Sequence, residues 1–170
     1  MEGYAEQQSV ELKSKVMGSK EYFRILVFDD HPEILKLLQV VFHARGGYEV
    51  FTYTNPAACP IFNHENCSCP DGQSCSDIIL TDINMPVIRG IEFIEKQITK
   101  GCNCRHLALM SGDFTPEDES RASELGVKFF RKPFKISAVF DWLDQVEKDI
   151  SPHRRLTECR KLQGMTSLSR

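Results

Sequence analysis

The stretch Phe23–Asp30 reads FRILVFDD, six residues that are apolar apart from Arg24 and then two aspartates. A short apolar run that ends in polar residues is typical of a buried strand. Pro32 follows closely, where the first turn of a helix tolerates proline. Apolar residues then recur at helical spacing as far as Phe42. The segment therefore predicts a buried strand, a polar strand end and a helix.

The same strand-and-helix unit recurs along the chain. We expect further strands at residues 48–53, 77–82, 106–110 and 127–131, and helices at 90–100, from Thr115 to about Leu125, and from about Ile136 to about Asp149. Strands that are apolar throughout and alternate with helices predict an α/β fold with a parallel sheet covered on both faces.

Length and composition predict one domain with extensions, because domains commonly hold about 100–200 residues. We expect an extension at residues 1–20, a domain at 21–150 with a cysteine-rich insertion at about 59–76, and a basic tail at 151–170. The net charge of -3 does not favour nucleic acid as a partner. No apolar run approaches the ~20 residues that span a bilayer, and no secretory signal begins the sequence, so we expect a cytoplasmic protein.

Polar residues follow four of the expected strands, and the carboxyl ends of parallel strands share one edge of a sheet. They are Asp29, Asp30, Asp82, Ser111 and Lys132. Converging carboxylates repel one another unless a cation joins them, and Mg²⁺ prefers carboxylates, water and phosphate oxygens. Such an ion serves phosphoryl transfer, and a carboxylate can accept the group as an acyl phosphate. The sequence therefore predicts a phosphoryl-transfer site.

Four pieces of this sequence resemble the receiver domains of response regulators in two-component signalling, of the chemotaxis-regulator-like kind. They are VFDD at 27–30, LTDINMPVIRG at 80–90, MSG at 110–112 and RKPF at 131–134. The resemblance covers roughly residues 22–150, with the pieces in order at successive strand ends. It implies a doubly wound, flavodoxin-like sheet of five parallel strands in the order 2-1-3-4-5.

The resemblance also implies a role for each residue of the edge. Asp82 is the implied phosphoacceptor, which becomes an aspartyl phosphate, and Lys132 and Ser111 bind the phosphoryl group. The implied Mg²⁺ ligands are the carboxylates of Asp29, Asp30 and Asp82 and the backbone carbonyl of Asn84. Ser111 and Phe129 form the implied switch, and the peptide bond from Lys132 to Pro133 is expected to be cis.

The function implied is that of a signalling phosphoacceptor and not an enzyme: it catalyses only its own phosphorylation and dephosphorylation. The donor would be a sensor histidine kinase or a phosphotransfer protein, and phosphorylation would switch binding to an unknown downstream protein. The resemblance points to a homodimer through the fourth helix, fifth strand and fifth helix. Residues 151–170 are too few for an output domain, so we expect a stand-alone receiver.

Seven cysteines depart from the family pattern. Five of them lie in segments that should enter neighbouring strands at the amino-terminal edge: Cys67, Cys69, Cys75, Cys102 and Cys104. Such a group would suit a soft metal such as Zn²⁺. Three interpretations stay open, which are reduced thiols, disulfides formed on oxidation and a structural metal. The alternative function is a metal- or redox-sensing regulator built on a receiver fold.

Overall fold

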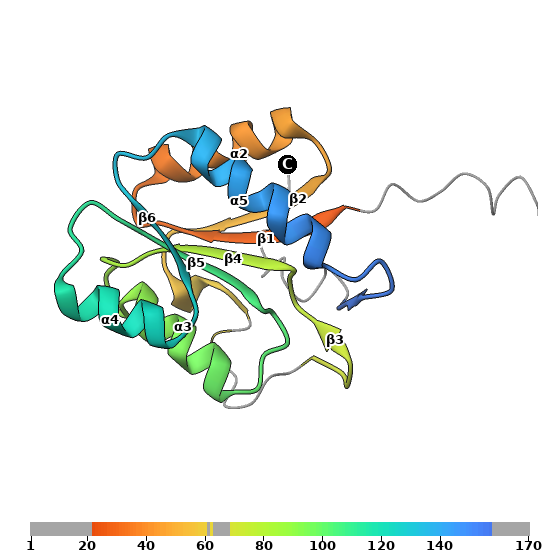
Figure 1. The fold of residues 1–170 in the computed structure, drawn as a ribbon. Helices are drawn as coiled ribbons and strands as arrows, with labels where there is room; N and C mark the ends of the chain where they lie inside the picture. The colour runs from red at the N-terminus through yellow and green to blue at the C-terminus, as the bar shows by residue number, and fades with distance from the viewer. Residues whose placement is uncertain (1–21, 61, 63–68, 158–170) are drawn as a thin grey trace, which may run out of the picture.

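Five parallel strands form the central sheet of the computed structural model, which describes residues 22–60, 62 and 69–157 (Figure 1). They are β1 (Phe23–Phe28), β2 (Tyr48–Tyr53), β4 (Ile78–Asp82), β5 (His106–Ser111) and β6 (Lys128–Arg131). Their order across the sheet is β2-β1-β4-β5-β6. Counted over these five strands this is 2-1-3-4-5, so the predicted fold class and strand order are confirmed.

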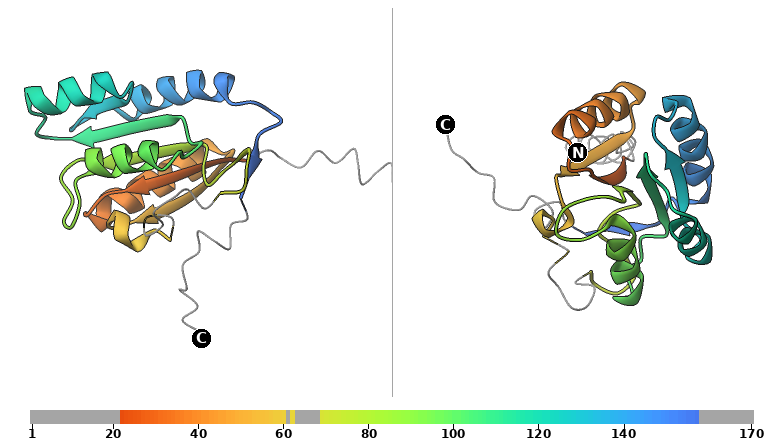
Figure 2. Two further views of the ribbon diagram at one scale, coloured as in Figure 1. Left: turned by 90° about the horizontal axis from the view of Figure 1, so that it is seen from below. Right: turned by 90° about the vertical axis from the view of Figure 1, so that its left-hand side faces the viewer.

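Two helices cover each face of the sheet (Figures 1 and 2). One face carries α2 (Pro32–Arg45) and α5 (Ile136–Asp149), and the other carries α3 (Gly90–Thr99) and α4 (Pro116–Glu124). Their bounds agree with the sequence prediction to within one or two residues. At α4, the Thr115 hydroxyl accepts a hydrogen bond from Asp118 N at 3.1 Å, and Thr115 N donates to the Asp118 carboxylate at 3.3 Å. This capping box fixes where the helix begins.

The core lies in two layers because successive strand residues point to opposite faces of the sheet. Ile25 and Val27 of β1 pack with α2 and α5, whereas Leu26 and Phe28 pack toward α3 and α4. All four side chains are fully buried. The strands are therefore held from both faces, which leaves the strand ends as the places where polar side chains can gather.

The segment after β2 contains no α-helix in its described residues. A 3₁₀ turn, η1 (Pro56–Ala58), follows, and the described part of the loop after it includes the two-residue strand β3 (Gln73–Ser74). β3 pairs in parallel with β7 (Arg155–Leu156) beside the amino ends of the main strands (Figure 1). The first residues of the predicted basic tail thus belong to the described fold.

A buried arginine ties this edge together. The Arg24 side chain donates to the carbonyl of Thr157 at 2.7 Å and to that of Cys75 at 3.2 Å, and its backbone N donates to Asp77 at 2.8 Å. Asp77 also pairs with Arg154 at 2.5 Å.

Among the described residues, no helix is both long and apolar enough to cross a membrane.

Candidate functional site

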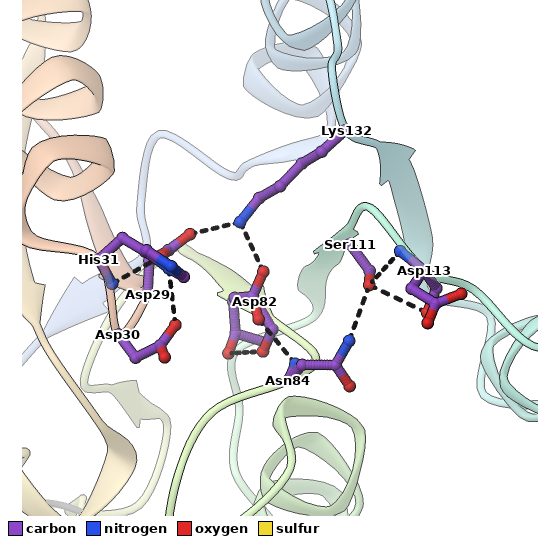
Figure 3. Close-up of polar contacts among 9 residues, drawn as sticks. Asp29, Asp30, His31, Asp82, Asn84, Ser111, Asp113 and Lys132 are labelled. Carbon is purple, nitrogen blue, oxygen red and sulfur yellow. Dashed lines mark hydrogen bonds and ion pairs between the residues drawn. The ribbon is translucent and has the colours of Figure 1, made fainter.

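The sheet brings the polar strand ends together at its carboxyl edge (Figure 3). Asp29 follows β1, Asp82 ends β4, Ser111 ends β5 and Lys132 follows β6. Asp29, Asp82 and Ser111 are buried, with exposed fractions of 0%, 6% and 1%. Four segments far apart in the sequence therefore supply one cluster of ionisable and hydroxyl groups.

Lys132 joins two of the carboxylates. Its ammonium donates to Asp29 Oδ2 at 2.6 Å and to Asp82 Oδ1 at 2.5 Å. Burial lowers the pKa of Lys132, but the hydrogen bonds to Asp29 and Asp82 outweigh burial and leave the pKa raised. The lysine is thus a fixed positive charge between two buried acids. The bond from Lys132 to Pro133 is cis, as the resemblance implied.

The backbone around Asp82 holds its carboxylate in place. Asn84 N donates to Asp82 Oδ2 at 2.6 Å, so that each carboxylate oxygen has one donor. Gly90 N donates to the Ile83 carbonyl at 2.8 Å, which folds the β4–α3 loop back on the strand end. A Cβ at Gly90 would lie only 1.9 Å from the Asp82 carbonyl oxygen. Glycine is therefore required there for close backbone approach.

The acidic pair after β1 includes a third potential ligand, His31. Asp29, Asp30 and His31 each offer one ligand atom within 4.8 Å of the others. His31 Nδ1 lies 3.2 Å from Asp29 Oδ1 and 2.9 Å from Asp30 Oδ1. The charge of Asp30, and then the hydrogen bond to Asp29, raises the pKa of His31. His31 is not among the residues that the sequence singled out, although its position directly after two acids was the available signal.

These oxygens fit a divalent cation. Asp30 Oδ1 is buried and has no partner in hydrogen-bond geometry, since its approach to His31 is close but poorly directed. A buried carboxylate oxygen without a donor is costly unless a cation satisfies it. Hard oxygen ligands of this kind suit Mg²⁺. The donor set is thus compatible with the ion that the resemblance implied.

The Ser111 hydroxyl is engaged on the far side of Asp82 from Lys132 (Figure 3). It accepts hydrogen bonds from Asn84 Nδ2 at 3.3 Å and Asp113 N at 3.1 Å, and lies 3.2 Å from the Asp113 carbonyl. Ser111 therefore lies beside the acceptor but is held by the neighbouring loops.

Phe129 lies on β6, away from the carboxylates. Its side chain is 38% exposed, and its ring packs against Phe114 with centroids 4.6 Å apart. The guanidinium of Arg131 lies over the Phe114 ring, 5.7 Å from its centroid. Phe129, which the resemblance implied as part of the switch, therefore lies partly exposed at the surface on the α4 side of the domain.

The cysteine prediction falls partly outside the described residues, because Cys67 is not among them. The other four, all of them described, lie near one another, although no three of their sulfurs all lie within 4.8 Å of one another. Cys75 Sγ lies 4.0 Å from Cys102 Sγ. Hydrogen bonds with Cys102 and Cys69, together with burial, raise the pKa of Cys75, and Cys104 contributes electrostatically.

The carboxyl edge and the fold together define a class of protein: a doubly wound α/β domain that gathers buried acids, a lysine and a hydroxyl at its strand ends. Residues 25–144 match the model of the response regulator receiver domain. This match covers well over half of the chain, and the chain belongs to that family.

Similar proteins agree with this assignment. Transcriptional regulatory protein FlgR of Helicobacter pylori is 26% identical over 126 residues, which is 74% of this chain but only 30% of FlgR. The chemotaxis protein CheY4 of Vibrio cholerae has a TM-score of 0.57 at 22% identity, covering 74% of this chain and 98% of CheY4. The HemR receiver domain of Leptospira biflexa has a TM-score of 0.61 at 21% identity, covering 76% and 98%. The structural likenesses support the fold.

Proposed function

We propose that this receiver domain is a phosphoacceptor switch that takes a phosphoryl group on Asp82. The main support is the setting of the Asp82 carboxylate, which is buried at a strand end. One of its oxygens lies 2.5 Å from the Lys132 ammonium and the other lies 2.6 Å from Asn84 N. A buried carboxylate that is held by a fixed cation beside two further acids is typical of a reactive site and not of a packed core. This arrangement supports phosphoryl transfer to Asp82.

In the proposed reaction an oxygen of the Asp82 carboxylate attacks phosphorus. A new O–P bond forms while the bond from phosphorus to the donor group breaks, and its electron pair leaves with the donor. Lys132 stays cationic and faces the transferred oxygens. A Mg²⁺ ion held by Asp29, Asp30, Asp82 and the Asn84 carbonyl would supply further positive charge for those oxygens.

We assign the switch to Ser111 and Phe129. The Ser111 hydroxyl would leave Asn84 and Asp113 and donate to the phosphoryl group on Asp82. Phe129, now 38% exposed, would then repack beside the position that Ser111 occupied. The expected result is a changed surface on α4, β6 and α5, where we propose the downstream partner or a second copy of the chain binds.

The donor that we propose is a histidine kinase or a phosphotransfer protein, as for the family. Turnover is limited to gain and loss of the protein's own phosphoryl group. The chain spans 30% of FlgR, so we do not carry over the regulation of transcription that FlgR's name states. The comparisons favour a receiver over the alternative of a dedicated metal or redox sensor.

The test is incubation with acetyl phosphate and Mg²⁺, followed by intact-mass analysis. We expect the mass to increase by one phosphoryl group, and Asp82→Asn to abolish the increase. Asp141→Asn is the matched control, because Asp141 lies on the exposed side of α5. A folded wild-type protein that gains no mass, or an Asp82→Asn variant that still gains it, would overturn the proposal.

A further inference from the structure

The described residues of the loop between η1 and β4, which are 59–60, 62 and 69–77, contain little regular structure. In its described residues only β3 (Gln73–Ser74) is regular. Long loops without secondary structure are uncommon in compact domains and usually carry a function. This loop nevertheless covers part of the α3 side of the core, where Phe62 packs on Phe93 with ring centroids 6.1 Å apart. A cross-link at residues 69–77 would help to hold this part of the loop against the core.

Four cysteines lie near one another where this loop passes the segment before β5, with Cys75 Sγ 4.0 Å from Cys102 Sγ. Cys69 and Cys75 come from the loop, and Cys102 and Cys104 from the α3–β5 connection. Cys75 and Cys104 are buried, with exposed fractions of 2% and 5%. Cys75 interacts with the other three side chains. The cluster therefore joins two segments that are about 30 residues apart in sequence.

Polar contacts align the two segments around the sulfurs. Asn103 Nδ2 donates to the Gln73 carbonyl at 2.8 Å. In sequence Gln73 lies between Cys69 and Cys75, and Asn103 lies between Cys102 and Cys104, so this bond links the two segments. The Ser76 hydroxyl lies 3.9 Å from Cys75 Sγ and also hydrogen-bonds with Cys104. These are contacts of the kind that orient ligands around a metal centre.

The distance between the Cys75 and Cys102 sulfurs is too long for a disulfide and is compatible with two ligands of one metal. Sulfurs in a disulfide are about 2 Å apart, whereas a tetrahedral zinc site with Zn–S near 2.3 Å separates its sulfurs by about 3.8 Å. Cys75 and Cys102 are 4.0 Å apart. Within the described residues, no three of these sulfurs all lie within 4.8 Å of one another. Binding all four sulfurs to one ion would therefore require them to move closer together than they are in this structure.

We propose that Cys69, Cys75, Cys102 and Cys104 bind one Zn²⁺ ion in a structural site at the amino-terminal edge of the sheet. Each thiol gives its proton to solvent and donates an electron pair to zinc, and no oxidant is needed. The site would carry negative charge, which the buried Arg24 guanidinium, 3.2 Å from the Cys75 carbonyl, helps to balance. This site is independent of the phosphorylation proposal.

The first test measures zinc in the full chain after purification with zinc present. We expect one zinc per chain in the wild type, and a fall of about tenfold or more in Cys75→Ser and Cys102→Ser. Cys59→Ser is the matched control, since Cys59 is a buried cysteine whose side chain hydrogen-bonds with Tyr53. It should keep its zinc. Loss of zinc in Cys59→Ser to the same extent as in Cys75→Ser would overturn the ligand set.

A second test uses the wild type alone, in case a variant fails to fold. Thiol reactivity with Ellman's reagent is measured before and after a zinc chelator. We expect four thiols to become reactive together as zinc is released. A folded wild type without zinc, a mass showing disulfides among these cysteines, or stoichiometric iron in place of zinc would each overturn the proposal.

Discussion

Lys132 should hold the carboxyl edge together, and Lys132→Met tests this. The substitution keeps most of the side-chain volume but removes the ammonium that lies 2.6 Å from Asp29 and 2.5 Å from Asp82. Two carboxylates with side-chain exposures of 0% and 8% would then face each other without a cation. Removing one partner of a buried charge pair costs about 3–5 kcal/mol.

The distances from Lys132 to the two carboxylates give a similar estimate of this free-energy cost. Both oxygens contact the same nitrogen, so they are no further apart than about 5 Å, and two unit charges at that distance repel by roughly 3 kcal/mol at an effective dielectric constant near 20. We therefore expect Lys132→Met to lower the free energy of unfolding by about 3 kcal/mol, and the melting temperature by roughly 6–12 °C.

The assay is urea unfolding followed by circular dichroism, in Mg²⁺-free buffer without a chelator so that the cysteine cluster is undisturbed. Asp82→Asn is added in a double-mutant cycle, because neutralising Asp82 removes most of the repulsion. The double variant should lose at least about 1.5 kcal/mol less than the sum of the two single variants. A cost below about 1 kcal/mol for Lys132→Met, or strictly additive effects, would refute the reasoning.

Three further substitutions test the loops and the α4 start by urea unfolding. Gly90→Ala places a Cβ 1.9 Å from the Asp82 carbonyl, so we expect a loss of about 2 kcal/mol or more; an unchanged midpoint would contradict the close packing. For Asp118, burial raises the pKa, but hydrogen bonds at the helix start and the nearby arginine leave it lowered in the folded state. Asp118→Asn should therefore cost about 1–3 kcal/mol at neutral pH, a difference present above the unfolded pKa near 3.9 and lost as pH falls through the lower folded pKa; a difference that grew toward acid pH would contradict it. Val87 has a φ of 75° and is 82% exposed, so Val87→Gly should raise stability by up to about 1 kcal/mol. The matched change Val40→Gly in α2 should lower it by about 1 kcal/mol, and equal effects of the two would argue against strain at Val87.

The sequence predicted the carboxyl edge well because two simple rules combine there. An apolar run ending in a polar residue marks a strand end, and parallel strands place their carboxyl ends together. Asp29, Asp82 and Lys132 could therefore be assigned to one edge without any contact being known. The contacts within the edge were less predictable, because side-chain hydrogen bonds between separate loops leave no pattern in the sequence. The hydrogen bond from Asn84 Nδ2 to the Ser111 hydroxyl, at 3.3 Å, is one such contact.

The amino-terminal edge was harder to predict, because its structure depends on pairings between distant residues. Arg24 lies inside an apolar strand, and its partners Cys75 and Thr157 are 51 and 133 residues away. The strands β3 and β7 have two residues each, too few to show the alternation that identifies a strand. The order of this edge therefore depends on long-range polar contacts that leave no local pattern.

The two edges are joined by the same pair of strands. Cys75 lies just before β4 and Cys104 just before β5, whereas Asp82 ends β4 and Ser111 ends β5. The strands pair directly, from Ile78 opposite His106 to Asp82 opposite Met110. Close-packed strands move as a unit and deform little. An ion bound by the cysteines would therefore hold the amino-terminal ends of β4 and β5 in position, without contacting the acids at the carboxyl edge. Zinc at this edge would therefore stabilise the frame on which the phosphorylation site is built.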